Sequence, residues 1–250
     1  MRLSSVSLKR TAAALCCCIA SSRAFVLSHR MRGGAPLSST SSSSTRFSST
    51  LQPASLLGAF GLFGGGDVDV KAVAQKPTPV DGIKQNKPAE VATLAGGCFW
   101  GLEKYFRNQF GKKLKSTWVG YVGGEKANPT YEQVCSGRTG HAEAIQIEYF
   151  PDEVAYEELL EFFWKLHDPT TPNRQGNDVG TQYRSAVFFH SPEQKEAAAK
   201  VMGEVQPKWK NKISTEIVEG KPEDFWPAEG YHQMYLFSNP MGYCNHRPRW

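Results

Sequence analysis

Apolar and polar positions recur along residues 90–220 with periods that predict alternating strands and helices. An apolar run over 90–95 predicts a buried strand, and apolar residues at helical spacing then predict a helix over 99–110. Gly111 follows this helix at the position where glycine commonly ends one. A second apolar stripe at helical spacing predicts a helix over 156–167.

The remaining pattern adds one helix and four strands. Ser191 and Pro192 are typical of a helix start, so the third helix begins there and runs to about residue 209. Alternating or continuous apolar runs predict strands over 115–122, 141–149, 183–189 and 213–218.

This order, β-α-β-β-α-β-α-β, predicts a domain of the α/β (α+β) class over residues 90–250. From Pro222 onward no period is visible, so an irregular C-terminal tail is expected. Two polar, turn-rich loops interrupt the pattern, over 123–131 and 168–181. The sequence holds no Gly-x-Gly-x-x-Gly fingerprint, which removes the usual support for nucleotide binding.

Residues 1–66 have the composition of a targeting presequence. They hold seven Lys or Arg and no Asp or Glu, and Lys9-Arg10 precedes the apolar run 12–20 as in a secretory signal peptide. A Ser/Thr/Arg-rich stretch follows, and it reads as a transit peptide. The combination resembles the bipartite presequence of plastids gained by secondary endosymbiosis, so we expect a plastid (chloroplast) location. A mitochondrial location and the secretory pathway are the alternatives.

Charge and hydropathy give no support for nucleic acid or a membrane as a partner. The whole chain has a net charge of +5, but the leader alone contributes seven positive charges, so residues 67–250 carry −2. Net charge therefore gives no argument for nucleic-acid binding. No apolar run approaches the roughly 20 residues that span a bilayer, and we expect no membrane partner. Residues 67–89, rich in Pro, Lys and Gln, are expected to form a linker.

Cys98 is the strongest candidate for chemistry. It lies between the predicted strand and helix in the run GCFWG at 97–101, with glycines that permit a sharp turn. A cysteine at a helix N-terminus meets free N–H groups and the positive end of the macrodipole, which favour the thiolate nucleophile. The alternative is an inert, buried cysteine. Phe99 and Trp100 suggest a small apolar pocket beside the sulfur.

Glu143 is the second candidate. By strand alternation it lies on the same face as Ile145 and Ile147, so its carboxyl points to apolar surroundings. Such surroundings raise a carboxyl pKa and make the group available as an acid. The alternative is a glutamate at a strand end that reaches solvent.

The two polar loops supply three further candidates, Asp178, Tyr183 and Tyr131. For Asp178 the alternative is turn chemistry, and for the tyrosines it is a hydrogen bond to the backbone.

The other cysteines form no disulfide framework. Cys16, Cys17 and Cys18 lie in the leader, and no Cys-x-x-Cys occurs. Cys244 lies in the tail, which could carry a second thiol to the first, whereas Cys135 reads as a small core or loop residue. His232 and His246 allow a zinc site to be considered, but their spacing fits no common one.

Taken together, these segments resemble the peptide-methionine (S)-S-oxide reductase family, the A type of methionine sulfoxide reductase. Five segments match in the family's order and span most of residues 90–244: GCFWG at 97–101, GYVGG at 120–124, NPTYEQVCSGRTGHAE at 128–143, RQGNDVGTQYRS at 174–185 and GYC at 242–244.

The resemblance implies a role for each candidate. Cys98 would attack the sulfoxide sulfur, Glu143 would protonate the departing oxygen, and Tyr131 and Tyr183 would donate hydrogen bonds to it. Phe99 and Trp100 would hold the substrate methyl group, Asp178 would help to fix the substrate and the polar network, and Cys244 would resolve the Cys98 sulfenic acid as a disulfide.

The resemblance also implies a two-layer sandwich with a mixed β-sheet, no cofactor or metal, and free methionine sulfoxide or oxidised proteins as substrates. Thioredoxin would be the reductant, and we expect a monomer that repairs proteins under oxidative stress. Many relatives carry a further cysteine after the position of Cys244, whereas this sequence has none there. The Cys98–Cys244 disulfide would then meet the reductant directly, unless Cys135 takes part.

Two other function classes compete. A thiol peroxidase also uses a cysteine at a helix start, but Glu143 and the two tyrosines favour sulfoxide reduction. A binding protein that has lost turnover is the other alternative, and the intact set of Cys98, Glu143 and Tyr183 argues against it.

Overall fold

The computed structural model describes residue 74 and residues 76–83 and 86–250. The predicted leader over 1–66, with its three cysteines, lies outside these residues, and so does the first part of the predicted linker. Within the described residues, no helix is long and apolar enough to cross a membrane.

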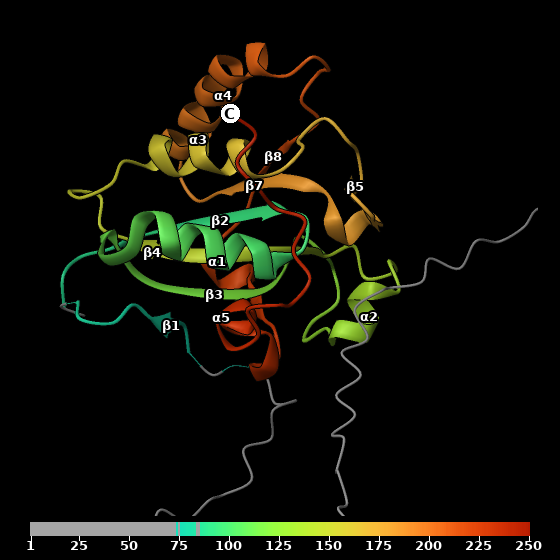
Figure 1. Cartoon of the computed structure of the whole chain (residues 1–250), viewed down its shortest axis with the longest axis horizontal. Coiled ribbons are helices and arrows are strands. Elements are labelled where there is room, and N and C mark those ends of the chain that lie inside the picture. Colours follow the sequence, from blue (N-terminus) through green and yellow to red (C-terminus); the bar gives the residue numbers. More distant parts are fainter. Residues whose placement is uncertain (1–73, 75, 84–85) are drawn as a thin grey trace, which may run out of the picture. The chain divides into compact units, whose positions relative to one another are not determined.

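The centre of the fold is a mixed β-sheet in the order β1-β3-β4-β2-β7-β8, with β9 pairing to β3 (Figure 1). Only β7 and β8 run parallel, and the other pairs are antiparallel. A separate hairpin joins β5 and β6. The strands are β1 Thr78–Pro79, β2 Glu90–Gly96, β3 Leu114–Val122, β4 Ala142–Tyr149, β5 Arg174–Gln175, β6 Asp178–Val179, β7 Ser185–Phe189, β8 Glu216–Glu219 and β9 Trp226–Pro227.

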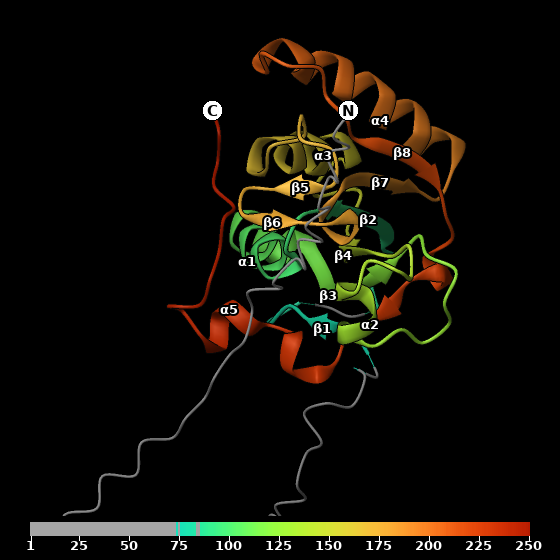
Figure 2. The same cartoon turned by 90° about the vertical axis from the view of Figure 1, so that its right-hand side faces the viewer.

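Among the described residues, five α-helices accompany the sheet: α1 Phe99–Phe110, α2 Tyr131–Cys135, α3 Tyr156–Leu166, α4 Pro192–Val205 and α5 Tyr235–Ser238. Short 3-10 turns include η2 Thr181–Tyr183 and η5 Gly230–His232. Figure 2 shows α3 and α4 near β7 and β8, and it shows α1 nearly end-on with the β5-β6 hairpin beside it.

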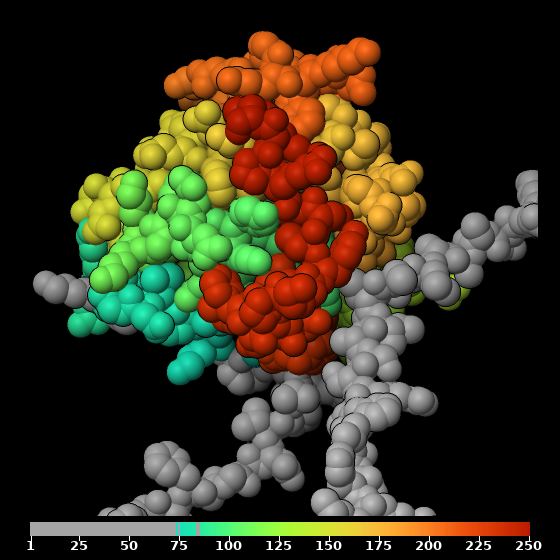
Figure 3. Space-filling model, in the orientation of Figure 1, coloured from blue at the N-terminus to red at the C-terminus, as the bar shows by residue number. Residues whose placement is uncertain are grey.

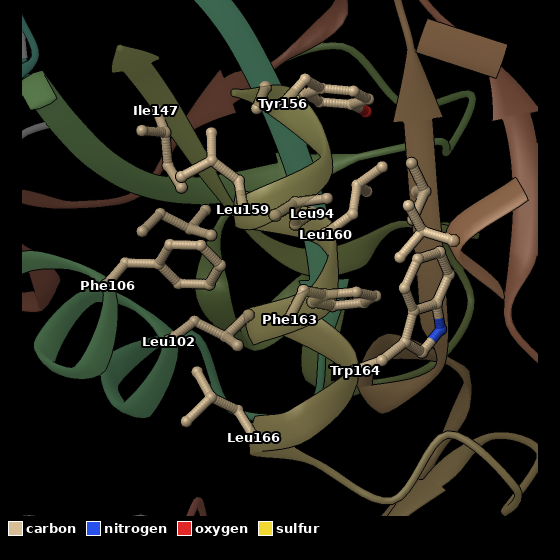
Figure 4. Packing of buried hydrophobic residues seen from close by; sticks show 14 of the residues in the cluster. Leu94, Leu102, Phe106, Ile147, Tyr156, Leu159, Leu160, Phe163, Trp164 and Leu166 are labelled. Atoms are coloured by element: carbon tan, nitrogen blue, oxygen red, sulfur yellow. The ribbon is translucent and has the colours of Figure 1, made fainter. Parts of the chain in front are cut away.

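The main core lies between one face of the sheet and helices α1, α3 and α4. Leu94 and Ile147 from the sheet, Phe106 from α1 and Phe163 from α3 are all fully buried in it (Figure 4). The helical spacing of the apolar residues explains this arrangement, because each helix presents one apolar stripe to the sheet. Burial of each such side chain contributes about 1.5–3 kcal/mol.

The last residues form a strap across the molecule. The C-terminal segment runs from α5 past the N-terminal end of α1 and up to α3 and α4 (Figure 1). In the space-filling view it forms a continuous band on this face (Figure 3). Backbone N–H groups of Arg247 and Arg249 donate to the carbonyls of Leu166 and Lys165 at the end of α3. The strap thereby satisfies carbonyls that a helix end leaves without an intrahelical partner.

The predicted fold class and the mixed sheet are confirmed, as are the three long helices. The prediction lacks helix α2, hairpin β5-β6 and the segments β9 and α5 of the tail. It also starts two strands too early, since β7 begins at Ser185 rather than 183 and β8 at Glu216 rather than 213. Within the segment expected to be a linker, Thr78–Pro79 forms β1 and pairs with β3.

Candidate active site

Cys98 lies where β2 turns into α1. Gly97 takes a φ of +95°, and a Cβ there would lie 2.6 Å from Gln175 Cγ, so this turn requires glycine. Cys98 is the N-cap residue of α1 and is only 4% exposed. The sulfur therefore lies at the positive end of the helix and is buried rather than on an open surface.

An aromatic wall surrounds the cysteine. Phe99, Trp100 and Tyr121 are buried in the same apolar cluster as Cys98, and Tyr131 packs against this cluster. The ring centroid of Phe99 lies 6.4 Å from that of Trp100 and 6.0 Å from that of Tyr121. The structure thus brings the predicted apolar pair and Tyr131 together around the thiol.

Glu143 reaches the same place from the sheet. It lies on β4 opposite Tyr121 of β3, and it is 1% exposed. The backbone N–H of Phe99, the residue after Cys98, donates to Glu143 Oε2 at 3.2 Å. The alternative of a solvent-exposed glutamate does not hold, and the carboxyl is anchored beside the nucleophile.

A second buried carboxylate, Glu229, links two residues of this aromatic wall through hydrogen bonds. The Tyr121 hydroxyl donates to Glu229 Oε2 at 2.9 Å, and the Tyr131 backbone N–H donates to Glu229 Oε1 at 2.9 Å. Burial, with the charges of Glu229 and Glu143 nearby, raises the pKa of Tyr121 well above its usual value. Tyr121 therefore stays a protonated phenol that can hold this bond.

His232 fixes the orientation of Trp100. Trp100 Nε1 donates to His232 Nδ1 at 3.1 Å, and burial lowers the pKa of His232 to about 3. The ring is therefore neutral at pH 7 and can accept this hydrogen bond. Tyr235 stacks on Trp100 with a centroid distance of 3.8 Å, and the Tyr131 ring centroid lies 4.6 Å from that of His232.

Cys244 lies against the first turn of α1. It packs against the apolar cluster that contains Cys98. A Cβ placed on Gly101 would lie 3.0 Å from Cys244 Sγ and 2.2 Å from His246 Nδ1. Burial raises the pKa of the Cys244 thiol, while Lys104 and the His246 carbonyl act in the opposite direction. The tail therefore brings a second thiol to the site.

Asp178 holds the strap in place next to Cys244. Its Oδ2 accepts a hydrogen bond from Asn245 Nδ2 at 2.8 Å, and the same amide group donates to the Gln175 carbonyl at 2.9 Å. His246 Nε2 in turn lies 2.8 Å from the carbonyl of Gly96. In this structure Asp178 belongs to a polar network that holds Asn245, the residue after the second cysteine.

Tyr183 is also buried, in turn η2, which packs against β4. Cys135 lies at the end of α2 and is partly exposed, outside the cluster around Cys98. In the part of the chain that the structure describes, no group of three or more His, Cys, Asp or Glu side chains could hold a metal ion.

The arrangement provides the groups that reduction of a sulfoxide by a thiol requires. These groups are a thiol at a helix start that can attack, a buried carboxyl that can deliver a proton, and a second thiol that packs against the same cluster. Sequence reasoning missed Tyr121, Glu229, His232 and Asn245 as contributors. A signal was present in the run EGYHQMY at 229–235, which is dense in acidic, histidine and aromatic residues within an otherwise irregular tail.

Known proteins with similar sequences belong to one family. A family model described as peptide methionine sulfoxide reductase matches residues 90–249. A protein from Streptomyces griseus called peptide methionine sulfoxide reductase MsrA is 51% identical over 159 residues, which cover 62% of this chain and 71% of the relative. An MsrA of Methanothermobacter thermautotrophicus is 49% identical over 157 residues, covering 62% and 90%.

Solved structures of proteins from the same family are also similar to this chain. The chain is similar to reduced Mxr1 from Saccharomyces cerevisiae, with 43% identity, a TM-score of 0.61, and coverage of 65% of this chain and 93% of that one. It is also similar to methionine sulfoxide reductase A of Corynebacterium diphtheriae, with 37% identity, a TM-score of 0.61 and coverage of 72% and 89%.

Proposed function

The chain belongs to the peptide methionine sulfoxide reductase family, and we propose that it reduces the S epimer of methionine sulfoxide, free or in proteins, with Cys98 as the nucleophile. It is a thiol-dependent oxidoreductase that returns methionine sulfoxide to methionine. One observation carries the assignment of the site: the carboxyl of Glu143 is buried and anchored to the backbone N–H of Phe99, directly beside Cys98 at the start of α1.

The first step reduces the substrate and oxidises Cys98. The Cys98 thiolate attacks the sulfoxide sulfur, and Glu143 gives a proton to the oxygen, because unprotonated oxide is a poor leaving group. Tyr131 and Tyr183 donate hydrogen bonds to that oxygen as charge develops on it. Once the bond between Cys98 and the substrate sulfur has formed, the protonated oxygen leaves as water. Water then attacks the Cys98 sulfur, the bond to the substrate sulfur breaks, methionine leaves, and Cys98 becomes a sulfenic acid. The substrate methyl group lies against Phe99 and Trp100.

The second step forms a disulfide. Cys244 attacks the sulfur of the sulfenic acid, water leaves, and the Cys98–Cys244 bond forms. This step is supported by the packing of Cys244 against the cluster that contains Cys98. Asn245 and His246, held by Asp178 and Gly96, keep the tail at this place.

Recycling then needs an external dithiol, and thioredoxin has the required chemistry. Cys98 is 4% exposed, whereas Cys244 is partly exposed. A reductant thiolate therefore reaches the sulfur of Cys244, and Cys98 leaves as a thiolate that the N-terminus of α1 stabilises. The second thiol of the reductant then displaces Cys244.

The reaction is tested with peptides that carry one epimer of methionine sulfoxide each, with dithiothreitol as reductant and the full chain as enzyme. We expect reduction of the S epimer alone and no turnover by Cys98→Ser. Cys244→Ser should keep the first turnover but lose steady-state turnover with thioredoxin. Full activity of Cys98→Ser would refute the nucleophile assignment, and normal thioredoxin-driven turnover of Cys244→Ser would refute the resolving role.

The proton donor is tested with Glu143→Gln. We expect the rate to fall by about 10²–10⁴-fold, with a greater loss at high pH than at low pH because solvent acid can partly replace the carboxyl. Glu148→Gln on the same strand is the control, since Glu148 bonds to Lys115 rather than to the site. A loss that is the same at every pH would count against Glu143 as the acid.

We also propose that residues 1–66 direct the chain to a plastid, on the strength of their acid-free, Ser/Arg-rich composition after an apolar run. A fusion of these residues to a fluorescent protein, expressed in an alga with secondary plastids, tests the proposal. Mitochondrial or secretory fluorescence would overturn it.

A further inference from the structure

Only one ring nitrogen of His246 takes part in a hydrogen bond. His246 is 4% exposed, and its Nε2 lies 2.8 Å from the carbonyl oxygen of Gly96. Among the residues that the structure describes, its Nδ1 is buried without a hydrogen-bond partner. A buried polar atom without a partner is uncommon in folded proteins, so this nitrogen is a candidate for a function.

The bond to Gly96 determines which nitrogen of the ring carries the hydrogen. A carbonyl oxygen can only accept, so Nε2 of His246 is the donor. Burial lowers the pKa of His246 to about 4, and the ring is therefore neutral at pH 7. A neutral ring carries a single hydrogen, which leaves Nδ1 with a lone pair that can accept a proton.

This lone pair lies next to the second thiol of the site. A Cβ on Gly101 would lie 3.0 Å from Cys244 Sγ and closer still to His246 Nδ1, so both atoms border the same small space beside α1. The Cys244 thiol also donates to the backbone carbonyl of His246, with 4.0 Å between sulfur and oxygen. One short segment of the strap thus holds the thiol and the imidazole together.

Cys244 needs a proton acceptor when it forms the disulfide. Burial raises the pKa of its thiol, although the His246 carbonyl and the charge of Lys104 act in the opposite direction. The thiol is therefore protonated at pH 7, whereas the thiolate is the effective nucleophile. The steps described above supply an acid beside Cys98, in Glu143, but no base beside Cys244.

We propose that His246 Nδ1 takes the proton of the Cys244 thiol while Cys244 attacks the Cys98 sulfenic acid. The S–H bond of Cys244 and the S–O bond of Cys98 break, and the S–S bond forms, so Cys244 is oxidised and Cys98 is reduced to the level of a disulfide. The proton passes from Nδ1 to the leaving hydroxyl, which departs as water and returns the ring to its neutral form. This inference rests on the proposed function and adds a proton acceptor to its second step.

The neighbouring groups make His246 a weak base but leave this transfer open. The charge of Arg249 adds to the effect of burial on the pKa of His246, and His167, the other histidine nearby, is neutral at pH 7 because burial lowers its pKa to about 3. A weak base is sufficient, because the S–H proton becomes more acidic as the sulfur forms its second bond. The titratable groups that face Cys244 come from α1 and β6: Lys104, Tyr105 and Asp178.

The test follows a single turnover of the full chain with an S-sulfoxide peptide and no reductant. His246→Gln is the variant, because the amide nitrogen of glutamine can still donate to Gly96 while the side chain holds no basic atom. We expect methionine to form at the wild-type rate and the disulfide to form about 10²-fold more slowly at pH 6. Mass spectrometry of quenched samples distinguishes the dithiol, the sulfenic acid and the disulfide, and the sulfenic acid should accumulate in the variant.

The pH profile separates a proton acceptor from a residue that only positions the strap. In the wild type the rate of disulfide formation should change little between pH 6 and 8, because the neutral thiol is the reactant. In His246→Gln it should rise about tenfold per pH unit, as the thiolate fraction of Cys244 does. A loss by the same factor at every pH, or no loss, would overturn the inference. Failure of the wild type to form methionine would refute the proposed function instead.

Two further variants complete the test. His246→Asn also lacks a basic atom and should show the same pH-dependent loss. His190→Gln is the matched control, because His190 is a partly buried histidine whose ring nitrogens bond to Thr93 and to the Gly220 carbonyl. It should leave both steps unchanged, and a pH-dependent loss of disulfide formation in this control would overturn the assignment to His246.

Discussion

Glu229 shows how much depends on one side chain that has no direct part in the reaction. Its two oxygens accept hydrogen bonds from the Tyr121 hydroxyl on β3 and from the Tyr131 backbone on α2. It therefore fixes the distance between the sheet and the short helix that carries a proposed oxygen-binding tyrosine. A carboxylate is required because both partners are donors.

Glu229→Gln replaces one of these acceptor oxygens by an NH₂ group, which leaves one buried donor without a partner. We expect a loss of about 1–3 kcal/mol in unfolding free energy and a fall in kcat of about 10–100-fold at a little-changed KM, through misplacement of Tyr131. Urea denaturation and steady-state kinetics with dithiothreitol measure both. Glu132→Gln, an exposed acid on α2, should change neither. Wild-type kinetics in Glu229→Gln would contradict this role.

At the residue scale, the sequence predicts those groups whose evidence lies close to them in the chain. Cys98 is recognisable from the glycines beside it, and Glu143 from the alternation of its strand. Glu229 and His232 are not recognisable in this way, because their partners are 98 to 132 positions away. Only the folded chain brings these partners together.

At the scale of elements, the first turn of α1 and the C-terminal strap pack so closely that a glycine is needed where they meet. Gly101 leaves room for the His246 ring, which would come within 2.2 Å of a Cβ at this position. A side chain at this position therefore requires the His246 ring, and the strap that carries it, to shift.

Gly101→Ala should therefore slow formation of the Cys98–Cys244 disulfide while leaving the thiol of Cys98 in place. We expect one equivalent of methionine per enzyme in the first turnover, and thioredoxin-driven turnover at least tenfold slower than in the wild type. Gly203→Ala is the matched control, since nothing lies within 4 Å of a Cβ at that helical glycine. Undisturbed thioredoxin-driven turnover in Gly101→Ala would show that the strap does not position Cys244.

Elements that are long and periodic were predictable, and short ones were not. The helices α1, α3 and α4 each carry an apolar stripe, so their spacing alone indicates them. The five residues of α2 and the two-residue strands β5 and β6 are too short for a period to be visible. They are fixed by contacts such as the Thr130–Gln133 capping box and the hydrogen bond that the Asp168 backbone N–H donates to the Gln175 side chain.

At the scale of the whole molecule, three buried histidines link stability to pH. Burial lowers the pKa of His167 to about 3, of His232 to about 3 and of His246 to about 4. In the unfolded chain these side chains titrate near pH 6.5. Below that pH the unfolded state binds protons that the folded state does not, so acid favours unfolding.

The unfolding free energy should be greatest above pH 6.5 and should fall as the pH is lowered toward 4, by up to about 1.4 kcal/mol per pH unit for each histidine. Urea denaturation at pH 7, 6 and 5 measures the slope, in a range above the ordinary pKa of carboxyl groups. His246→Gln should reduce the slope by the contribution of one histidine, which is at most about 1.4 kcal/mol per pH unit. A flat profile between pH 7 and 5 would contradict the assignment of these rings as neutral.

The position of Cys98 carries a consequence for the balance between stability and activity. As the N-cap of α1 it makes no side-chain capping bond, and the first turn of the helix holds no acidic residue. Glu143 accepts the N–H of Phe99, but the N-cap side chain itself adds no bond, so the helix is left less stable than it could be at the place where a reactive thiol benefits from nearby N–H groups. Cys98→Ser, which should be inactive, is expected to raise the unfolding free energy by about 0.5–1 kcal/mol by supplying a cap. If this gain is measured, the residue that makes the start of α1 reactive is also the residue that limits the stability of that helix.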